Sequence, residues 1–240
     1  MVDVPWLRPL RVLAFGDSNT WGFVADPSGG APARLPDDRR WPGVMQAALG
    51  SDVTVLVDAI CGRRTDVDAE PGTEQNPPSL RVVAPSSFNG WAHAEVAGLA
   101  CAPLDLAMVM LGTNDFAIQP ARPVADIAQA CVRVGQALVR GAAGFTPGRV
   151  PRVLLLCPPP LGGDGTAPEG MPAWPAFWQA SRQLAPALAQ AADCAGMAFM
   201  DGAAATVTTG ADRIHLDAAD HHRLGQAVAC RVRALLEFAP

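Results

Sequence analysis

Four short groups of polar residues could carry chemistry, and they span residues 16–20, 61–63, 112–115 and 212–215. The first group, Gly-Asp-Ser-Asn-Thr, directly follows an apolar segment, and its glycine permits a sharp turn. Ser18 is therefore expected at the start of a helix, where free backbone N–H groups favour a developing negative charge. A serine at such a position could serve as a nucleophile.

Asp212 and His215 are the groups that such a serine needs. An aspartate three residues before a histidine in a turn can bind one imidazole nitrogen and leave the other facing outward. That arrangement supplies a general base together with the carboxylate that orients it. By contrast, we interpret Asp17 and Asp115 as carboxylates that brace their loops.

The composition excludes several classes of function. The chain has 240 residues and a net charge of −5, and its 18 basic residues are all arginine, with no lysine and no tyrosine. Without lysine there is no Schiff-base chemistry, no pyridoxal site and no Walker A or kinase lysine. The negative charge argues against a nucleic-acid groove or a polybasic membrane surface. The expected partner is a small molecule.

Neither the cysteines nor the histidines form a metal-binding pattern. The six cysteines lie at least 26 residues apart, so no CxxC pair exists, and we interpret them as free thiols in mainly apolar surroundings. His221 and His222 are neighbours on a predicted helix and point about 100° apart, so they cannot bind one metal ion together. We therefore expect no metal and no cofactor.

The amino-terminal segment lacks the apolar core of a signal peptide. The longest apolar stretch, residues 96–112, contains Pro103 and Asp105 and is too short to span a bilayer. These features predict a cytoplasmic protein that does not act at a membrane.

Short apolar segments alternate with longer segments of helical periodicity. The predicted strands are nearly continuous in apolar residues, as strands buried on both faces should be, and they cover 11–15, 53–57, 106–111, 152–157 and 197–200. The predicted helices cover 123–141, 176–195 and 217–238. This alternation predicts one α/β domain over residues 1–240, with a parallel sheet of about five strands between two layers of helices.

Three long loops, rich in proline and glycine, are predicted near residues 24–42, 66–90 and 158–175. Loops beyond the carboxyl ends of strands build the binding site in open α/β sheets. Several apolar side chains in or beside these groups and loops are candidates for lining a substrate pocket: Trp21, Cys61, Trp91, Trp174 and Ile214. Arg63 and Arg64 fit two interpretations, either ion-paired structure or contact with substrate.

In their order and at these positions, the four groups resemble the motif blocks of the SGNH, or GDSL, hydrolase family. The flanking sequences RVLAFGDSNTWGF, VMLGTNDF and DRIHLD look most like its small arylesterase and acyltransferase branch. The resemblance implies a three-layer, flavodoxin-like αβα fold. It also implies Ser18 as nucleophile, His215 as base and Asp212 as the orienting acid. The implied oxyanion hole consists of the N–H groups of Ser18 and Gly62 and the side chain of Asn114.

The chain departs from the usual blocks at three positions. Asn19 replaces the leucine that commonly follows the serine, and Cys61 replaces the serine that commonly precedes the block II glycine. Ala59 occupies a position where a further glycine is often found.

The resemblance predicts a serine esterase that hydrolyses small carboxylic esters through an acyl-serine, with acyl transfer to alcohols where the channel excludes water. One alternative is a carbohydrate or natural-product O-acetyl deacetylase with the same triad, in which Arg63, Glu70 and Asn89 contact sugar. Another is a non-enzymatic, flavodoxin-like binding module. Relatives of this branch are often oligomers, so the resemblance also leaves a homo-oligomer open.

Overall fold

The computed structural model describes residues 9–26, 33–69, 84–118, 121–143, 150–162 and 174–237. Within these residues, one sheet has five parallel strands in the order β4-β1-β5-β6-β7. The strand bounds are Leu10–Gly16 (β1), Val53–Ala59 (β4), Leu106–Met110 (β5), Arg152–Cys157 (β6) and Ala198–Asp201 (β7). All five predicted strands and the predicted α/β fold class are confirmed.

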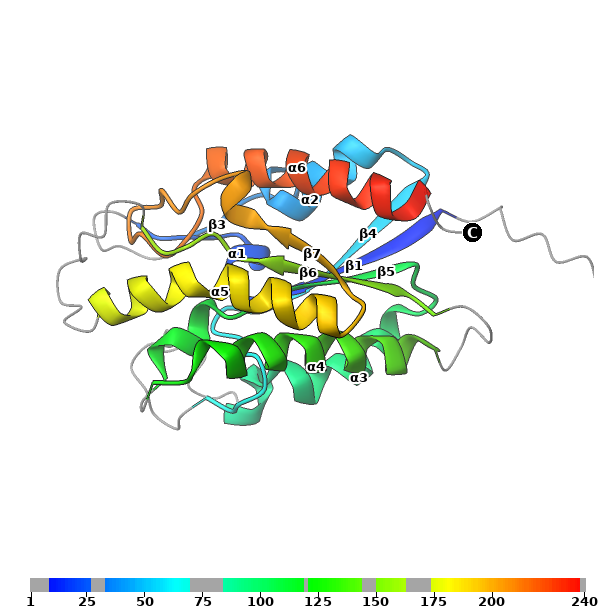
Figure 1. Ribbon diagram of the computed structural model, residues 1–240. Coiled ribbons are helices and arrows are strands. Elements are labelled where there is room, and N and C mark those ends of the chain that lie inside the picture. The colour runs from blue at the N-terminus through cyan, green and yellow to red at the C-terminus, as the bar shows by residue number, and fades with distance from the viewer. Residues whose placement is uncertain are drawn as a thin grey trace, which may run out of the picture.

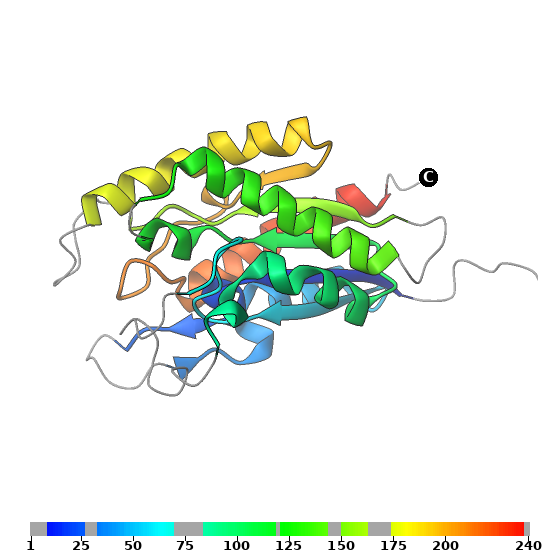
Figure 2. The same cartoon turned by 90° about the horizontal axis from the view of Figure 1, so that it is seen from below.

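Helices cover both faces of the sheet (Figure 1). On one face lie α2 (Trp41–Leu49) and α6 (Ala218–Glu237). On the other lie α3 (Gly90–Cys101), α4 (Val124–Ala143) and α5 (Trp174–Cys194), which Figure 2 shows from below. The three helices predicted at 123–141, 176–195 and 217–238 are confirmed as α4, α5 and α6, with ends within two residues of the prediction.

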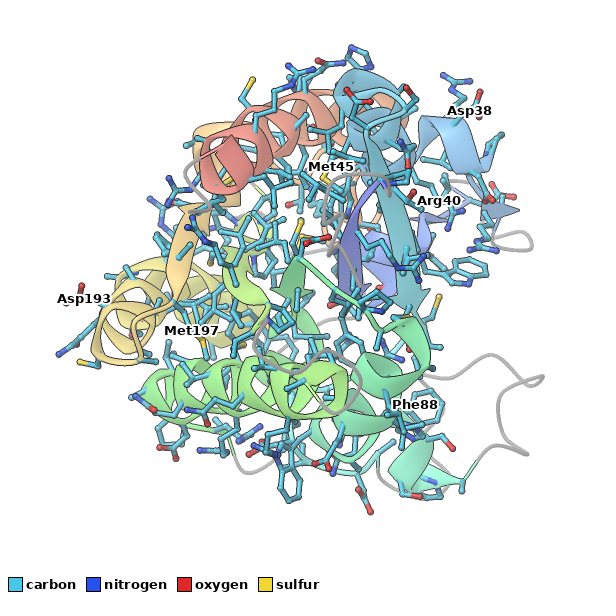
Figure 3. All side chains as sticks on the ribbon, turned by 90° about the vertical axis from the view of Figure 1, so that its right-hand side faces the viewer. Asp38, Arg40, Met45, Phe88, Asp193 and Met197 are labelled. Atoms are coloured by element: carbon cyan, nitrogen blue, oxygen red, sulfur yellow. The ribbon has the colours of Figure 1, made fainter. Side chains whose placement is uncertain are left out.

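The strands form two apolar layers because their side chains point alternately to opposite faces. In β1, Leu13 and Phe15 pack in the layer beneath α3, α4 and α5, whereas Val12 and Ala14 pack beneath α2 and α6. Met45 of α2 lies in this second layer, between its helix and the sheet (Figure 3). Burial on both faces explains why the strands are apolar at nearly every position.

The predicted loop at 24–42 is wrong in part. Phe23–Val24 (β2) and Ala33–Arg34 (β3) form a small antiparallel ribbon, Asp37–Arg39 form a 3-10 turn, and α2 already begins at Trp41. In the other two predicted loops, residues 70–83 and 163–173 lie outside the described residues.

The sequence analysis also missed α2 and α3. Helix α3 buries small residues against its neighbours, namely Gly90, Ala94, Ala97 and Gly98. It also exposes Trp91, Val96 and Leu99, so no apolar stripe marks its buried face. In the described part of the chain, no helix is both long enough and apolar enough to cross a membrane.

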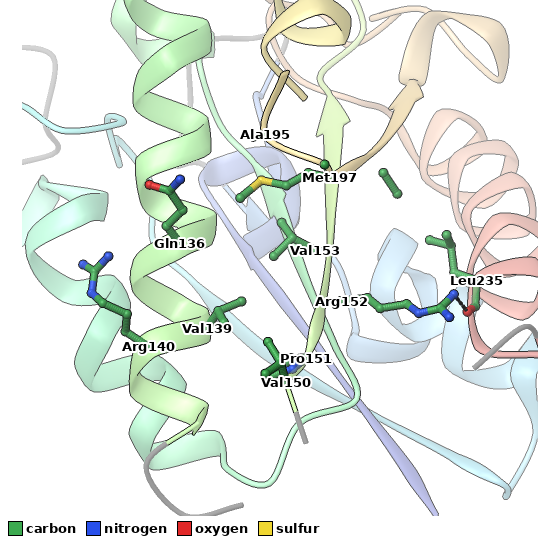
Figure 4. A pocket seen from close by; sticks show the side chains of 12 residues that line it. Gln136, Val139, Arg140, Val150, Pro151, Arg152, Val153, Ala195, Met197 and Leu235 are labelled. Carbon is green, nitrogen blue, oxygen red and sulfur yellow. Dashed lines mark hydrogen bonds between the residues drawn. The ribbon is translucent and has the colours of Figure 1, made fainter. Parts of the chain in front are cut away.

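The order of the strands determines where a site can form. From β1 the chain crosses to β4 on one side and later to β5 on the other. Ligands bind open α/β sheets at such a switch point, outside the carboxyl ends of the strands. A cavity of about 720 Å³ lies at the opposite end, where Val153 of β6 and Met197 before β7 face Gln136 of α4 (Figure 4). None of the predicted pocket residues lines this cavity.

Candidate active site

Ser18 is the first residue of a very short helix, α1 (Ser18–Trp21), directly after β1. Asp17 caps this helix in an extended conformation, and its Oδ1 accepts a hydrogen bond of 3.0 Å from the Asn19 N–H. A Cβ atom on Gly16 would lie 2.0 Å from Thr20 Oγ1, so the turn into α1 requires glycine at this position. The structure therefore places Ser18 where the sequence predicts it.

His215 and Asp212 complete a hydrogen-bonded chain with Ser18. His215 Nε2 lies 2.8 Å from Ser18 Oγ, and His215 Nδ1 lies 2.5 Å from Asp212 Oδ2. The Ser18 residue is buried, and the imidazole and the carboxylate are largely buried. Ser18 thus lies almost 200 positions from the other two residues in sequence, yet the three side chains have the arrangement that a serine hydrolase uses for its nucleophile, base and orienting carboxylate.

The carboxylate of Asp212 fixes the tautomer of the imidazole. Burial raises the pKa of Asp212, but hydrogen bonds from the His215 ring and from the N–H groups of Ile214 and His215 outweigh this effect and lower it. An ionised carboxylate can only accept hydrogen bonds, so Nδ1 carries the proton. The lone pair of Nε2 then faces Ser18 Oγ.

The turn that carries His215 has an unusual backbone. Arg213 has a φ of 61°, a left-handed conformation that is uncommon outside glycine. Backbone hydrogen bonds hold this turn on both sides: Arg213 N–H donates to Gly210, Gly210 N–H donates to His215, and Gly162 N–H donates to Arg213. Such outliers persist only where surrounding contacts fix them.

Asp220 anchors the same loop to α6. It is fully buried and accepts hydrogen bonds from Thr206 Oγ1 at 2.6 Å and from Thr209 N–H at 3.0 Å. Asp217 and Asp220 also cap α6 reciprocally, because the side chain of each accepts a hydrogen bond from the other's N–H. The sequence analysis missed Asp220, although the spacing of a capping box could have indicated it.

The predicted oxyanion donors lie on the loops that follow β4 and β5. Gly62 occupies the turn between Ile60 and Arg63 with a φ of 79°, which favours glycine. Asn114 lies in the 3-10 turn Thr113–Ala117, and its Nδ2 donates to the Arg63 carbonyl at 3.0 Å. The same nitrogen lies 3.4 Å from Asp17 Oδ2. Asn114 thus joins the turn of Gly62 to the residue that precedes Ser18.

A buried ionic network holds these two loops together. Asp115 accepts from the N–H of Thr65 at 3.0 Å, from its hydroxyl at 2.6 Å and from Arg122 at 2.6 Å. Burial raises the pKa of Asp115 to about 6, despite these hydrogen bonds. Burial likewise raises the pKa of Asp17 to about 6, against the hydrogen bond from Asn19. Both carboxylates brace loops, as the sequence analysis interpreted them.

An aromatic side chain that the sequence analysis missed packs on the imidazole. The rings of Phe23 and His215 are tilted by 39°, with centroids 4.2 Å apart. Phe23 pairs in the ribbon with Arg34, whose guanidinium lies 4.5 Å above the ring of Trp21. No sequence pattern indicates the Phe23 contact, because the rest of the ribbon that carries it falls in the segment 24–42, which was predicted as a loop.

The remaining pocket candidates fall in different places. The Cys61 thiol is half-buried beside the turn of Gly62, and burial followed by the charge of Asp17 raises its pKa to about 12, so it is a weak nucleophile. Ile214 packs partly against the core. The side chain of Trp91 is 46% exposed at the start of α3, and the backbone N–H of Trp91 donates to the Thr65 carbonyl. Trp174 begins α5, but its side chain lies outside the described residues.

The two arginines beside Gly62 are ion-paired or bound to backbone. Arg63 is buried, pairs with Asp58 at 2.7 Å and donates to the Gly16 carbonyl at 3.0 Å, while Arg64 donates to the Asp68 carbonyl. Asn89 caps α3 and is also buried. The deacetylase alternative expects Arg63 and Asn89 to contact sugar, but in this structure both side chains are buried and hydrogen-bonded within the chain. Glu70 lies outside the described residues.

The two adjacent histidines of α6 have separate environments. His221 is buried and accepts a hydrogen bond from the Trp41 N–H, whereas His222 is exposed. In the described part of the chain, no group of three histidine, cysteine, aspartate or glutamate side chains could hold a metal ion.

Comparison with known proteins gives the family of this fold and site. Residues 14–223 match the family model of the GDSL-like lipase/acylhydrolase family. No curated protein matches the chain.

Two solved structures resemble nearly the whole chain. One is a carbohydrate acetylesterase from Sinorhizobium meliloti, with 30% identity, a TM-score of 0.80, and coverage of 94% of this chain and 99% of that one. The other is an aryl esterase from M. smegmatis in an inhibitor-bound form, with 31% identity, a TM-score of 0.81, and coverage of 95% of this chain and 100% of that one.

Proposed function

We propose that this chain, which belongs to the GDSL-like lipase/acylhydrolase family, hydrolyses small carboxylic esters through an acyl intermediate on Ser18. That it is a carboxylic ester hydrolase follows from the family and from the two similar esterases, and this overturns the alternative of a non-enzymatic binding module. The observation that carries the proposed mechanism is the hydrogen-bonded chain from Ser18 Oγ through His215 to Asp212.

In the acylation step, His215 Nε2 accepts the hydroxyl proton while Ser18 Oγ forms a bond to the ester carbonyl carbon. The electron pair of the C=O bond moves onto oxygen, which becomes an oxyanion. Asp212 stabilises the imidazolium and remains ionised. The oxyanion then re-forms the carbonyl, the bond to the alcohol oxygen breaks, and His215 returns its proton to the leaving alcohol.

We assign stabilisation of the oxyanion to the N–H groups of Ser18 and Gly62 and to the side chain of Asn114. The Asn114 amide has two N–H bonds, and the Arg63 carbonyl binds the nitrogen at 3.0 Å. Its second contact, to Asp17 Oδ2, is long at 3.4 Å and weak, so the second N–H is available to the substrate oxyanion. Losing one such donor typically costs about 3 kcal/mol of transition-state stabilisation.

Deacylation repeats the sequence with a second nucleophile. His215 takes a proton from water, the new oxygen bonds to the acyl carbon, and the bond to Ser18 Oγ breaks as the serine recovers its proton. An alcohol in place of water gives acyl transfer. Phe23, which packs on the imidazole, supports a dry approach for the acyl-serine. A transfer-to-hydrolysis ratio no higher than the mole fraction of added alcohol would contradict this.

Acetylated carbohydrates are a second candidate substrate class, because one of the two similar esterases is a carbohydrate acetylesterase. Comparing kcat/KM on aryl acetates and on acetylated sugars decides between the classes. A preference for acetylated sugars would favour the second class.

The mechanism is tested with p-nitrophenyl acetate as substrate. We expect turnover by the wild type and loss of turnover in Ser18→Ala and His215→Ala. Wild-type activity in either variant would contradict the mechanism. The cytoplasmic location and a homo-oligomeric state stay predictions, which fractionation of the source cell and light scattering would test.

A further inference from the structure

The residue that follows the nucleophile contacts the loop that carries the base. Asn19 is 1% exposed. Its Nδ2 donates to the Ile214 carbonyl at 3.3 Å, and its Oδ1 accepts from the Leu216 N–H at 3.0 Å. These two peptide groups lie immediately before and after His215, so one side-chain amide holds both sides of the residue that carries the imidazole.

From this contact we infer that Asn19 is a positioning residue, which keeps the His215 imidazole at hydrogen-bond distance from Ser18 Oγ. The inference rests on the proposed function, because it assigns a role in the same triad. Asn19 is adjacent to Ser18 in α1, and its own N–H binds Asp17 Oδ1 at 3.0 Å. Asn19 therefore links the two segments directly, because its backbone is bonded beside Ser18 and its side chain is bonded on both sides of His215.

The chemistry of the side chain explains why asparagine is needed here. Its amide offers one donor and one acceptor in a plane, as a peptide group does. The leucine that is usual at this position in the sequences that the chain resembles offers neither. Leu216 is also buried, so its N–H would lack a partner without Asn19.

The chain contains a second amide with the same geometry, far from the triad. Gln46 Nε2 donates to the Val53 carbonyl at 2.8 Å, and its Oε1 accepts from the Val55 N–H at 2.7 Å. These groups bracket Thr54 at the amino end of β4, the opposite end from the turn of Gly62. Gln46 thus provides a matched control for the loss of an amide that binds two backbone groups.

The test compares Asn19→Ala with Gln46→Ala, using p-nitrophenyl acetate as substrate. Active sites are counted in each preparation by the burst of p-nitrophenol from a p-nitrophenyl phosphonate that modifies the serine. For Asn19→Ala we expect kcat per counted site to fall roughly 10²-fold, with KM changed by less than about 3-fold. For Gln46→Ala we expect a lower Tm but an unchanged kcat per counted site. A kcat in Asn19→Ala equal to that in Gln46→Ala would overturn the inference.

A second variant keeps the test decisive if Asn19→Ala does not fold. In Asn19→Asp, the neutral carboxyl group can donate and accept as the amide does, whereas the ionised group can only accept. We expect kcat per counted site to fall as pH rises through the pKa of the introduced carboxyl, which burial raises. A pH profile parallel to that of the wild type would overturn the inference.

The two proposals fail in different ways. If Ser18→Ala retains turnover, the proposed function fails. If the wild type shows one burst per chain and Ser18→Ala shows none, but Asn19→Ala behaves as Gln46→Ala does, only the role of Asn19 fails.

Discussion

Asp212 uses its two oxygens for different purposes. Oδ1 accepts from the N–H groups of Ile214 and His215, which fixes the backbone of the turn, and Oδ2 binds the imidazole. The same residue therefore sets both the position and the tautomer of the His215 imidazole.

We predict that Asp212→Asn lowers kcat about 10⁴-fold with little change in KM, because an amide that donates to Nδ1 leaves the proton on Nε2. Steady-state kinetics with p-nitrophenyl acetate measures this effect. Circular dichroism checks that the variant is folded. A decrease of less than tenfold would show that the tautomer does not limit the reaction.

Among single residues, the sequence predicts a functional role where the residue type and its motif imply a chemistry. Ser18, Asp212 and His215 are such residues, and the structure brings them together. Asn19 differs from the usual leucine, but the sequence did not indicate its contacts, and it gave no indication of the role of Phe23. Their contacts depend on how distant segments pack, which residue types do not specify.

At the scale of elements, the loop before α6 depends on Asp220. Its carboxylate accepts from Thr206, Thr209 and Asp217 and pairs with Arg223. We predict that Asp220→Ala lowers the free energy of unfolding by about 3 kcal/mol, because buried donors lose their acceptor. Urea denaturation measures this, with Asp193→Ala as control, since Asp193 is exposed at the end of α5 (Figure 3). Equal stability of the two variants would contradict the prediction.

Helices α2 and α6 meet at a histidine that resists protonation. Burial lowers the pKa of His221 to about 4, although Asp220 and Asp217 oppose this effect, while Arg40 and His215 add to it. The unfolded chain therefore binds more protons than the folded chain between about pH 4 and 6.5, and stability falls as pH falls through this window.

We predict that His221→Asn, which keeps an acceptor for the Trp41 N–H, loses less stability on acidification than the wild type. Near pH 4, the wild type should have lost about 3 kcal/mol more of its free energy of unfolding than the variant. Urea denaturation at pH 7 and at pH 4.5 tests this. If both proteins lose the same free energy of unfolding between pH 7 and pH 4.5, groups other than His221 cause the acid sensitivity.

Elements with strong periodicity could be predicted from the sequence, and those without it could not. The buried strands and α4 have continuous or striped apolar patterns, and all were found. Helix α3 buries only small residues, and the ribbon of β2 and β3 has two residues in each strand. Neither leaves a pattern that distinguishes it from a loop.

At the scale of the whole molecule, the fold brings three crossover loops and the turn before α6 to one region. Ser18 follows β1, Gly62 follows β4 and Asn114 follows β5, and these three strands are neighbours at the switch point. The strand order could be anticipated from the family resemblance, whereas the alternation of strands and helices predicts only a parallel sheet.

The mechanism assigns every proton transfer and every stabilising contact to side chains and backbone of this chain. We therefore predict that dialysis against EDTA leaves kcat with p-nitrophenyl acetate unchanged. Loss of activity that returns on addition of a divalent metal ion would contradict this assignment.

The central claim is that Ser18, with His215 as its base, forms a covalent bond to the acyl group of an ester. The most direct measurement is to treat the wild type with the p-nitrophenyl phosphonate, digest it and locate the adduct by mass spectrometry. We predict one adduct per chain, on the peptide that contains Ser18, with none in Ser18→Ala and much slower formation in His215→Ala. An adduct on Cys61 or on another serine, or turnover that continues in the modified enzyme, would contradict the account.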